Sequence, residues 1–301
     1  MGEIAGFREF EVMVMLTDPT AAAHGAGGSP SKPDAIFAGL FPTADESDET
    51  MAGHSKWKNI KHYKAATDAK RGVLFTKLIR EITMAAKLGG GDPAGNARLR
   101  MAIDAGRAKS LPRDNIERAI KNGTGELKGN DIQEATYEGY GPGGVALIVD
   151  TMTDNPTRTV ADVRHKFSRA GGNLGTPGSV SFMFDKKGQI ALDATRYVDE
   201  DATLEAALEA GAEDFRREDD VYVVTTDPAS LYAVKAALDA KGIESSDAEI
   251  AMVPKNTVPV SGKDDVSALF KLIEALEDLD DVQKVWGNFD VDDADMEDLE
   301  A

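Results

Sequence analysis

Val221-Tyr-Val-Val-Thr-Thr226 is a run of β-branched and aromatic residues, and such a run is typical of a strand buried in a sheet. On both sides of it, short apolar runs typical of strands are interspersed with longer, periodic runs typical of helices. In chain order they are a strand, a helix, two strands, a helix and a strand, at 189–192, 199–210, 214–215, 221–226, 228–241 and 249–253. The sequence therefore predicts a βαββαβ, or ferredoxin-like, domain over 185–259.

The flanking residues predict a second set of similar elements that this domain interrupts. Before it, Val145-Ala-Leu-Ile-Val149 and Ser179-Val-Ser-Phe-Met-Phe184 are interpreted as strands, and 156–170 as a helix with Val160, Val163 and Phe167 inward. After it, we expect a helix at 263–278 and a strand at 282–289. The fold class is thus α+β, with one α/β domain from 131–184 plus 260–291 and the second inserted into the first.

Residues 51–130 predict an all-helical N-terminal domain. Leu74, Leu78, Ile82 and Ala85 repeat on one helical face, which predicts a helix over 72–88 that ends at Gly89-Gly-Gly91. A second helix is expected at 96–108, with Leu99, Ile103 and Gly106 inward. A third is expected from Asp114, as its N-cap, to Lys121.

Charge is strongly segregated along the chain, although the 301 residues carry a net charge of −19. Residues 51–130 hold 17 basic and seven acidic side chains, whereas 131–301 hold 15 basic and 37 acidic ones. A sign asymmetry of this size indicates a surface for a charged partner. The alternative is that the basic side chains only solvate helix faces.

The two ends of the chain are expected to lie outside the folded domains. Residues 1–50 are acidic and rich in Gly and Pro, which predicts a disordered extension or a misassigned start with Met51 as the natural one. Residues 292–301 predict an acidic tail that is solubilising or mimics phosphate. The absence of Cys, of a targeting signal and of an apolar run of about 18 residues predicts a cytoplasmic protein without a membrane partner.

Aromatic rings and lysines are interleaved where the basic segment begins, which favours nucleic acid as partner. Lysine and arginine neutralise phosphates, and exposed rings stack on unpaired bases. For Trp57 a core position is equally open. The candidate nucleic-acid-binding residues are His54, Lys56, Trp57, Lys58, Lys61, His62, Lys64, Lys70, Arg71, Lys77 and Arg80.

Catalytic motifs are missing from the sequence. It contains no P-loop, no H-E-x-x-H and no G-x-S-x-G motif, and His54 and His62 do not have a metal-ligand spacing. We therefore expect no enzyme activity, no catalytic residues, no metal, no cofactor and no small-molecule substrate.

Several long motifs, taken together and in this order, resemble the YebC family over about 51–290. They are Ala52-Gly-His-Ser-Lys-Trp57, Ala69-Lys-Arg-Gly72, Phe75-Thr-Lys-Leu-Ile-Arg-Glu81, Ala86-Lys-Leu-Gly-Gly-Gly-Asp-Pro93, Leu111-Pro-Arg-Asp-Asn-Ile-Glu-Arg-Ala-Ile120, Tyr137-Glu-Gly-Tyr-Gly-Pro-Gly-Gly144, Thr157-Arg-Thr-Val-Ala-Asp-Val-Arg-His165 and Gly171-Gly-Asn-Leu-Gly175. The resemblance implies a helical domain followed by two α/β domains.

The resemblance and the charge pattern together predict a non-enzymatic, nucleic-acid-binding regulator of gene expression. The family implies a probable transcriptional regulator that binds DNA through the basic domain. It equally implies a ribosome-associated translation factor that binds ribosomal RNA and relieves stalling at proline-rich stretches. A protein-interaction module is the remaining alternative. The sequence decides neither the target nor the oligomeric state.

Overall fold

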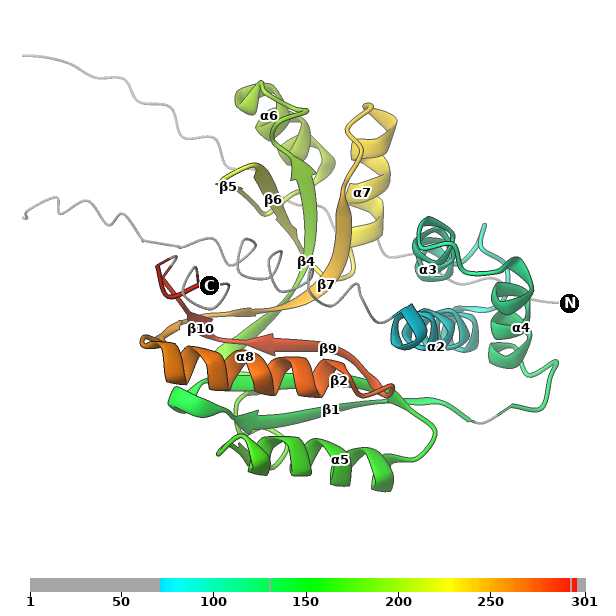
Figure 1. Cartoon of the computed structure of the whole chain (residues 1–301). Coiled ribbons are helices and arrows are strands. Elements are labelled where there is room, and N and C mark those ends of the chain that lie inside the picture. The colour runs from blue at the N-terminus through cyan, green and yellow to red at the C-terminus, as the bar shows by residue number, and fades with distance from the viewer. Residues whose placement is uncertain (1–70, 130, 293, 297–301) are drawn as a thin grey trace, which may run out of the picture. The chain divides into compact units, whose positions relative to one another are not determined.

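The computed structural model describes residues 71–129, 131–292 and 294–296 (Figure 1). Helices and antiparallel sheets are combined in this part of the chain, so the α+β class is confirmed. Residues 1–50 and 297–301, and with them the predicted extension and the end of the predicted tail, lie outside the described residues. The described part of that tail is not free, because Met296 packs against the core of the first sheet.

Three helices form the basic segment: α2 (Arg71–Gly89), α3 (Ala97–Ala108) and α4 (Arg113–Gly123). The predicted inward faces are confirmed except at Leu74, which lies outside the apolar cluster that buries Ile82, Leu99 and Ile103. Asn96 joins α2 to α3: its amide donates to the carbonyls of Ala85 (2.8 Å) and Gly90 (2.9 Å). Its side-chain oxygen accepts from the N–H of Leu99 and so caps α3.

The predicted Asp114 cap of α4 is wrong. Pro112 occupies the N-cap position without a side-chain hydrogen bond, and Asp114 lies inside the first turn. The cap therefore lies two residues before the predicted one, and the helix starts without a polar cap after an extended proline. Asp114 is still favourable there, because an acidic side chain in the first turn complements the helix dipole.

The first sheet has the strand order β3-β1-β2-β9 and is antiparallel throughout. Its strands come from two distant parts of the chain. They are β1 (Gln133–Tyr140), β2 (Ala146–Thr153), β3 (Asn173–Leu174) and β9 (Val282–Gly287). Two helices, α5 (Pro156–Arg169) and α8 (Lys263–Glu277), bury Val163, Phe167 and Leu269 in one cluster with Leu147 and Val149 of β2.

The second sheet has the antiparallel order β5-β6-β4-β7. It is built from one continuous stretch, in the element order βαββαβ. The elements are β4 (Phe184–Asp193), α6 (Glu200–Ala210), β5 (Asp214–Glu218), β6 (Val221–Thr226), α7 (Leu231–Ala240) and β7 (Asp247–Pro254). Tyr222 and Val224 are buried with Leu231 and Leu238 of α7. A short parallel pair, β8 (Val258–Pro259) and β10 (Phe289–Asp290), completes the strands of the described residues.

The predicted strand at 179–184 is wrong. Ser181–Met183 is a 3-10 helix (η2), and β4 begins only at Phe184. The reason is the buried carboxylate of Glu138 in β1. It accepts hydrogen bonds from the backbone N–H groups of Gly178 (2.8 Å), Val180 (2.7 Å) and Ser181 (2.8 Å), so these donors have no need of a neighbouring strand.

Candidate nucleic-acid interface

Most of the predicted nucleic-acid-binding residues lie outside the described part of the chain. Arg71 is the first residue of α2. The structure places the side chains of only two of the set, Lys77 and Arg80, both on α2. Those outside are His54, Lys56, Trp57, Lys58, Lys61, His62, Lys64 and Lys70.

Arg80 is turned toward the acidic part of the chain and is largely buried. Its Nη1 lies 2.7 Å from Oδ1 of Asp281, and the Arg80 side chain is 16% exposed. The same nitrogen donates to the backbone carbonyl of Asp280. A guanidinium held by two such acceptors is not available to a phosphate.

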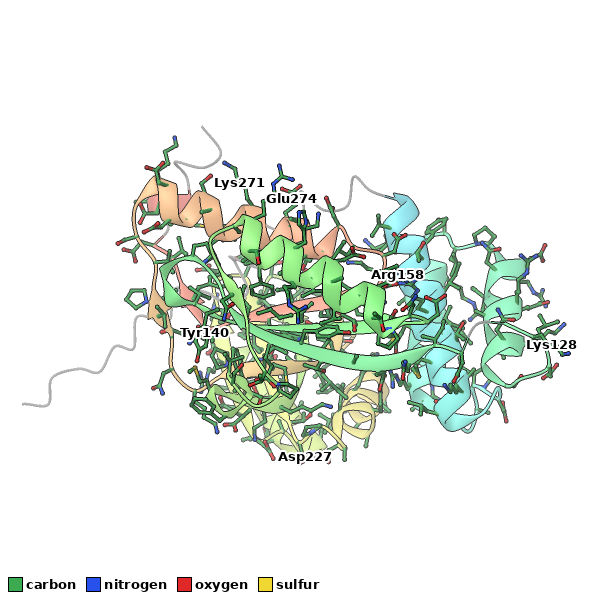
Figure 2. All side chains as sticks on the ribbon, turned by 90° about the horizontal axis from the view of Figure 1, so that it is seen from below. Lys128, Tyr140, Arg158, Asp227, Lys271 and Glu274 are labelled. Atoms are coloured by element: carbon green, nitrogen blue, oxygen red, sulfur yellow. The ribbon has the colours of Figure 1, made fainter. Side chains whose placement is uncertain are left out.

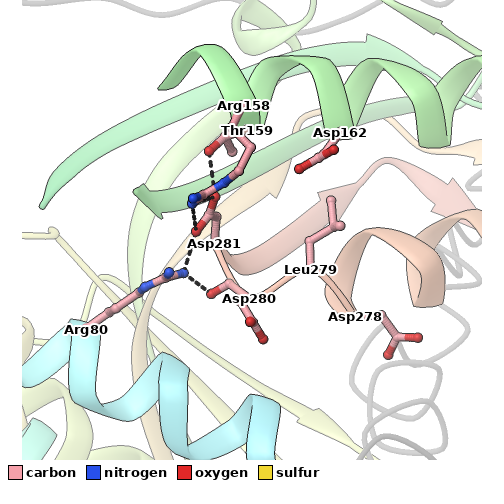
Figure 3. A pocket seen from close by; sticks show the side chains of 8 residues that line it. All are labelled: Arg80, Arg158, Thr159, Asp162, Asp278, Leu279, Asp280 and Asp281. Carbon is pink, nitrogen blue, oxygen red and sulfur yellow. Dashed lines mark hydrogen bonds and ion pairs between the residues drawn. The ribbon is translucent and has the colours of Figure 1, made fainter. Parts of the chain in front are cut away.

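Asp281 is the acceptor of a larger network (Figure 3). Nη2 of Arg158 donates to both carboxylate oxygens, at 3.0 and 2.8 Å, and the Thr159 hydroxyl donates at 2.6 Å. Burial by itself raises the pKa of the Asp281 carboxyl. The hydrogen bonds from Arg158 and Thr159 and the charges of Arg80 and Arg158 outweigh burial, so its pKa is lowered overall.

Lys77, one turn earlier on α2, faces the same acidic segment. Burial lowers the pKa of its ammonium group, and the charge of Lys284 acts in the same direction. Glu277, Asp278 and Asp280 oppose this shift. Lys77 is therefore partly buried and lies within the influence of charged side chains of 277–284.

Two more cations of the helical segment pair with residues at the start of 131–301, the acidic body of the protein. Lys87 donates to the Asp131 carboxylate and to the carbonyl of Ile132. Arg98 binds Glu81 through two nitrogens, at 2.7 and 3.0 Å, and Glu134 at 2.8 Å. Much of the positive charge on α2 and at the start of α3 is thus neutralised within the protein.

Several cations of the helical segment are exposed, and those that also lack a partner among the described residues lie on and after α4. Arg118, Lys121 and Lys128 are exposed, and their side chains make no ion pair or hydrogen bond with any other described residue. Arg118 and Lys121 are three residues apart and share one face of α4. Lys128 projects outward from the loop that follows (Figure 2). We define these three residues as the α4 basic surface.

Sequence reasoning did not select the α4 basic surface, although a signal for it was present. Ile116, Ala119 and Ile120 belong to the core of the helical segment, so Arg118 and Lys121 must lie on the far side of α4. The rings interleaved with lysines at 54–63 favoured the beginning of the segment as the binding surface instead.

A cavity of about 360 Å³ lies beside the Arg80–Asp281 pair (Figure 3). Its charged lining consists of two arginines and the four aspartates 162, 278, 280 and 281. This negative balance is unsuited to a phosphate. Within the described ranges, no three His, Asp or Glu side chains are arranged to hold a metal ion. Nor does that part of the chain contain a helix long and apolar enough to cross a membrane.

Comparison with known proteins matches both parts of the chain to one family. Residues 55–126 match the TACO1/YebC protein N-terminal domain, and 132–289 match the TACO1/YebC second and third domain. A relative from Gemmatimonas aurantiaca, named "Probable transcriptional regulatory protein", is 61% identical over 82% of this chain and 100% of its own length. One of the same name from Acidithiobacillus ferrooxidans is 55% identical over 83% of this chain and 99% of its own.

A solved structure agrees with these sequence matches. The crystal structure of a conserved hypothetical protein from Aquifex aeolicus is similar with a TM-score of 0.69 and 47% identity. The match covers 75% of this chain and 93% of that protein. The domain matches, the relatives and the solved structure agree, and the chain therefore belongs to the TACO1/YebC family.

Proposed function

We propose that this protein is a non-enzymatic regulator of gene expression that binds nucleic acid through its basic helical segment. The observation that carries the proposal is the α4 basic surface, three exposed cations with no acidic partner among the described residues. Lysine and arginine at such a surface gain affinity for phosphates by releasing counterions. The names of the relatives, probable transcriptional regulatory proteins, support a regulatory role.

The charge distribution defines how nucleic acid would approach. Residues 131–301 carry 22 more acidic than basic side chains, so most of the body repels a phosphate backbone. The basic helical segment then provides the favourable side. The residues proposed from the sequence, from His54 to Arg71, add to the α4 basic surface in this proposal. Arg80 is removed from it because Asp281 binds it.

A ribosome-associated translation factor is the second candidate. The interleaved rings of His54, Trp57, His62 and Tyr63 favour it, since unpaired bases of RNA stack on aromatic side chains. No described helix carries a set of side chains that singles it out as a base-reading helix. Transcriptional and translational roles therefore share the same basic surface and differ in the nucleic acid that it binds.

The experiment measures binding of the full chain to duplex DNA and to purified ribosomes across a salt series. A transcriptional regulator binds one DNA sequence about 10³-fold more tightly than random duplex at physiological salt. A translation factor binds ribosomes tightly while its DNA affinity collapses as salt increases. Binding to neither at low salt would contradict the proposal.

A triple variant tests whether the α4 basic surface binds the phosphates. Arg118→Gln, Lys121→Gln and Lys128→Gln together should weaken binding and reduce the salt slope on duplex DNA by about 0.9 for each phosphate that is no longer neutralised. The matched control replaces Arg196, Lys235 and Lys241 by Gln. These three side chains are paired with Glu244, Asp239 and Glu209, respectively. It changes the net charge equally and should leave binding unchanged.

We also propose that 185–259 is a domain inserted into the one formed by 131–184 and 260–291. The support is that all four strands of the second sheet come from 184–254, while the first sheet uses strands on both sides of it. Hydrogen exchange tests this: the amides of the second sheet should open together, separately from those of β1, β2 and β9.

A further inference from the structure

Phe182 is a large apolar side chain in an unusual place. It lies in η2 and is 64% exposed, and it is the only aromatic among the strongly exposed large apolar side chains of the described residues. Burying a phenylalanine side chain stabilises a fold, and most of this ring stays in contact with water. A ring displayed in this way is suited to a contact with another molecule.

The segment that displays Phe182 is held rigidly. Three backbone N–H groups, of Gly178, Val180 and Ser181, donate to the buried Glu138 carboxylate. On the same segment, the Tyr140 hydroxyl donates to the Ser179 carbonyl at 3.1 Å. The backbone next to Phe182 is therefore held in place before any partner binds, which lowers the entropy cost of binding.

Lys255 is bonded to the backbone of the residues that carry the ring. Its Nζ donates to the Phe182 carbonyl at 3.1 Å, and its backbone N–H donates to the Met183 carbonyl at 2.9 Å. The side chain is 47% exposed, and its other neighbour is Asp185 at 3.3 Å. A partly exposed cation held at the backbone of an exposed aromatic residue is suited to a nucleotide, with the ring on the base and the cation on the phosphate.

The charge around the segment differs from that of the rest of the body. Residues 171–183 contain no charged side chain, in a body with 37 acidic residues. Cations flank the segment on both sides in the sequence, and they have no ion pair with another described residue: Arg164, Lys166, Arg169 and Lys186. The nearest acidic side chain in the sequence, Asp185, is paired with Lys255, so local repulsion of a phosphate backbone is reduced here, although the body as a whole is acidic.

We infer that Phe182 stacks on an unpaired base of single-stranded RNA or of an RNA loop, while Lys255 contacts its phosphate. This inference rests on the proposed nucleic-acid-binding function and adds a second contact point on the acidic body. A protein partner fits less well. A protein interface needs a contiguous apolar centre, whereas 171–183 present one exposed ring among glycines and small polar residues.

The test uses the full chain and a fluorescein-labelled oligouridine of about 12 nucleotides, a length within the range of compact single-strand sites. Phe182→Ala should weaken binding to this strand about tenfold, a loss typical of removing one stacking side chain. Phe182→Trp should retain the wild-type affinity. Leu208→Ala is the matched control, because Leu208 is 53% exposed on α6 and lies outside the segment.

Two further measurements separate stacking from a general structural effect. Phe182→Ala should leave the salt slope unchanged, since a ring releases no counterion, while Lys255→Gln should lower the slope by at most about 0.7 on a single strand, because the Asp185 carboxylate already neutralises part of the Lys255 charge. Binding to a duplex of the same length should not respond to Phe182→Ala, because paired bases offer no free face. Circular dichroism and thermal melting check that each variant is folded.

The outcomes for the two proposals are distinguishable. If Phe182→Ala binds the single strand as the wild type does, while the triple variant of the α4 basic surface loses affinity, the Phe182 contact is refuted and the proposed function stands. The same result would leave a protein as the partner of Phe182. If the wild-type chain binds neither the single strand nor the duplex at low salt, both proposals fail.

Discussion

Arg80 on α2 and Asp281 at the start of β9 form an ion pair of 2.7 Å, although 200 residues separate them in the sequence. Asp281 also binds Arg158 and Thr159 of α5. One carboxylate, directly before β9, therefore binds side chains of both α2 and α5. It stabilises the contact between three parts of the fold at once.

Removing that carboxylate should destabilise the protein strongly. Asp281→Asn leaves Arg80 without its charged partner at a site where the acceptor is only 7% exposed. Breaking a buried pair from one side costs about 3–5 kcal/mol, so the urea midpoint of unfolding should fall markedly. The control is Asp104→Asn, which removes the exposed partner of Arg107 and should change stability by less than about 0.5 kcal/mol. Equal effects of the two substitutions would contradict this role of Asp281.

Arg80 and Arg118 should separate stability from nucleic-acid binding. Arg80→Gln should lower the melting temperature and leave the salt slope of binding unchanged, because Asp281 already holds the guanidinium. Arg118→Gln should leave the melting temperature unchanged and lower the salt slope on duplex DNA by about 0.9. Thermal melting and a salt titration of both variants check this. A reduced slope for Arg80→Gln would restore Arg80 as a phosphate contact.

Glu138 should make stability depend on pH below its ordinary pKa of about 4.5. Burial raises the pKa of this carboxyl, but the hydrogen bonds from Gly178, Val180 and Ser181 together lower it further than burial raises it. The unfolded chain therefore takes up the proton more readily than the folded one. The contribution to the free energy of unfolding is complete above the ordinary pKa and is lost as the pH falls through the lowered one.

The measurement compares wild type with Glu138→Gln in urea unfolding between about pH 6 and pH 3. The variant should be less stable at pH 6 by about 1–3 kcal/mol, since an amide cannot accept all three N–H groups. The difference should shrink toward pH 3. Glu205→Gln, an exposed carboxylate of α6, serves as the control and should follow the wild-type curve. A constant difference at every pH would show that Glu138 does not act through its charge.

Gly123 should be essential to the packing of α4 on α2. A Cβ at this position would lie 2.3 Å from the Thr83 carbonyl oxygen and 2.8 Å from Cβ of Ala86. Gly123→Ala should therefore separate the two helices and cost about 1–3 kcal/mol, as overpacking does. Gly72→Ala, at an exposed site on α2 with no atom within 4 Å, should instead be neutral or stabilise by up to about 1 kcal/mol. Thermal melting of both variants checks the opposite signs.

Local patterns predicted the helices and strands well because burial of an amphipathic face is periodic. The stripe through Ile82 and Ala85 on α2, and the one through Val163 and Phe167 on α5, lie in the cores that their spacing indicated. The strand expected at 179–184 failed for a different reason. Its alternating residues suit a strand, but the N–H groups of Val180 and Ser181 donate hydrogen bonds to the Glu138 carboxylate, about 40 residues earlier in the sequence.

The candidate site was predicted less well than the fold, because the partner of a charged side chain is not a local property. The helical period shows that Arg80 points away from its own core, and this is correct. Whether it then meets solvent, phosphate or a carboxylate depends on Asp281, which no pattern near Arg80 reveals. The exposure of Arg118 and Lys121 likewise depends on distant parts of the chain, since no acidic residue of the described chain pairs with them.

The pairing of β2 with β9 has a consequence for the timing of synthesis. Leu147 faces Gly287 across these strands, so β2 emerges from the ribosome on the order of ten seconds before its partner, at ~5–20 residues per second. The second sheet, encoded between them, can form during that interval. Until translation nears the C-terminus, the nascent chain carries β2 with an unpaired side, a template for aggregation. A chain whose synthesis ends before Val282 would therefore lack β9, and its first sheet could not be completed.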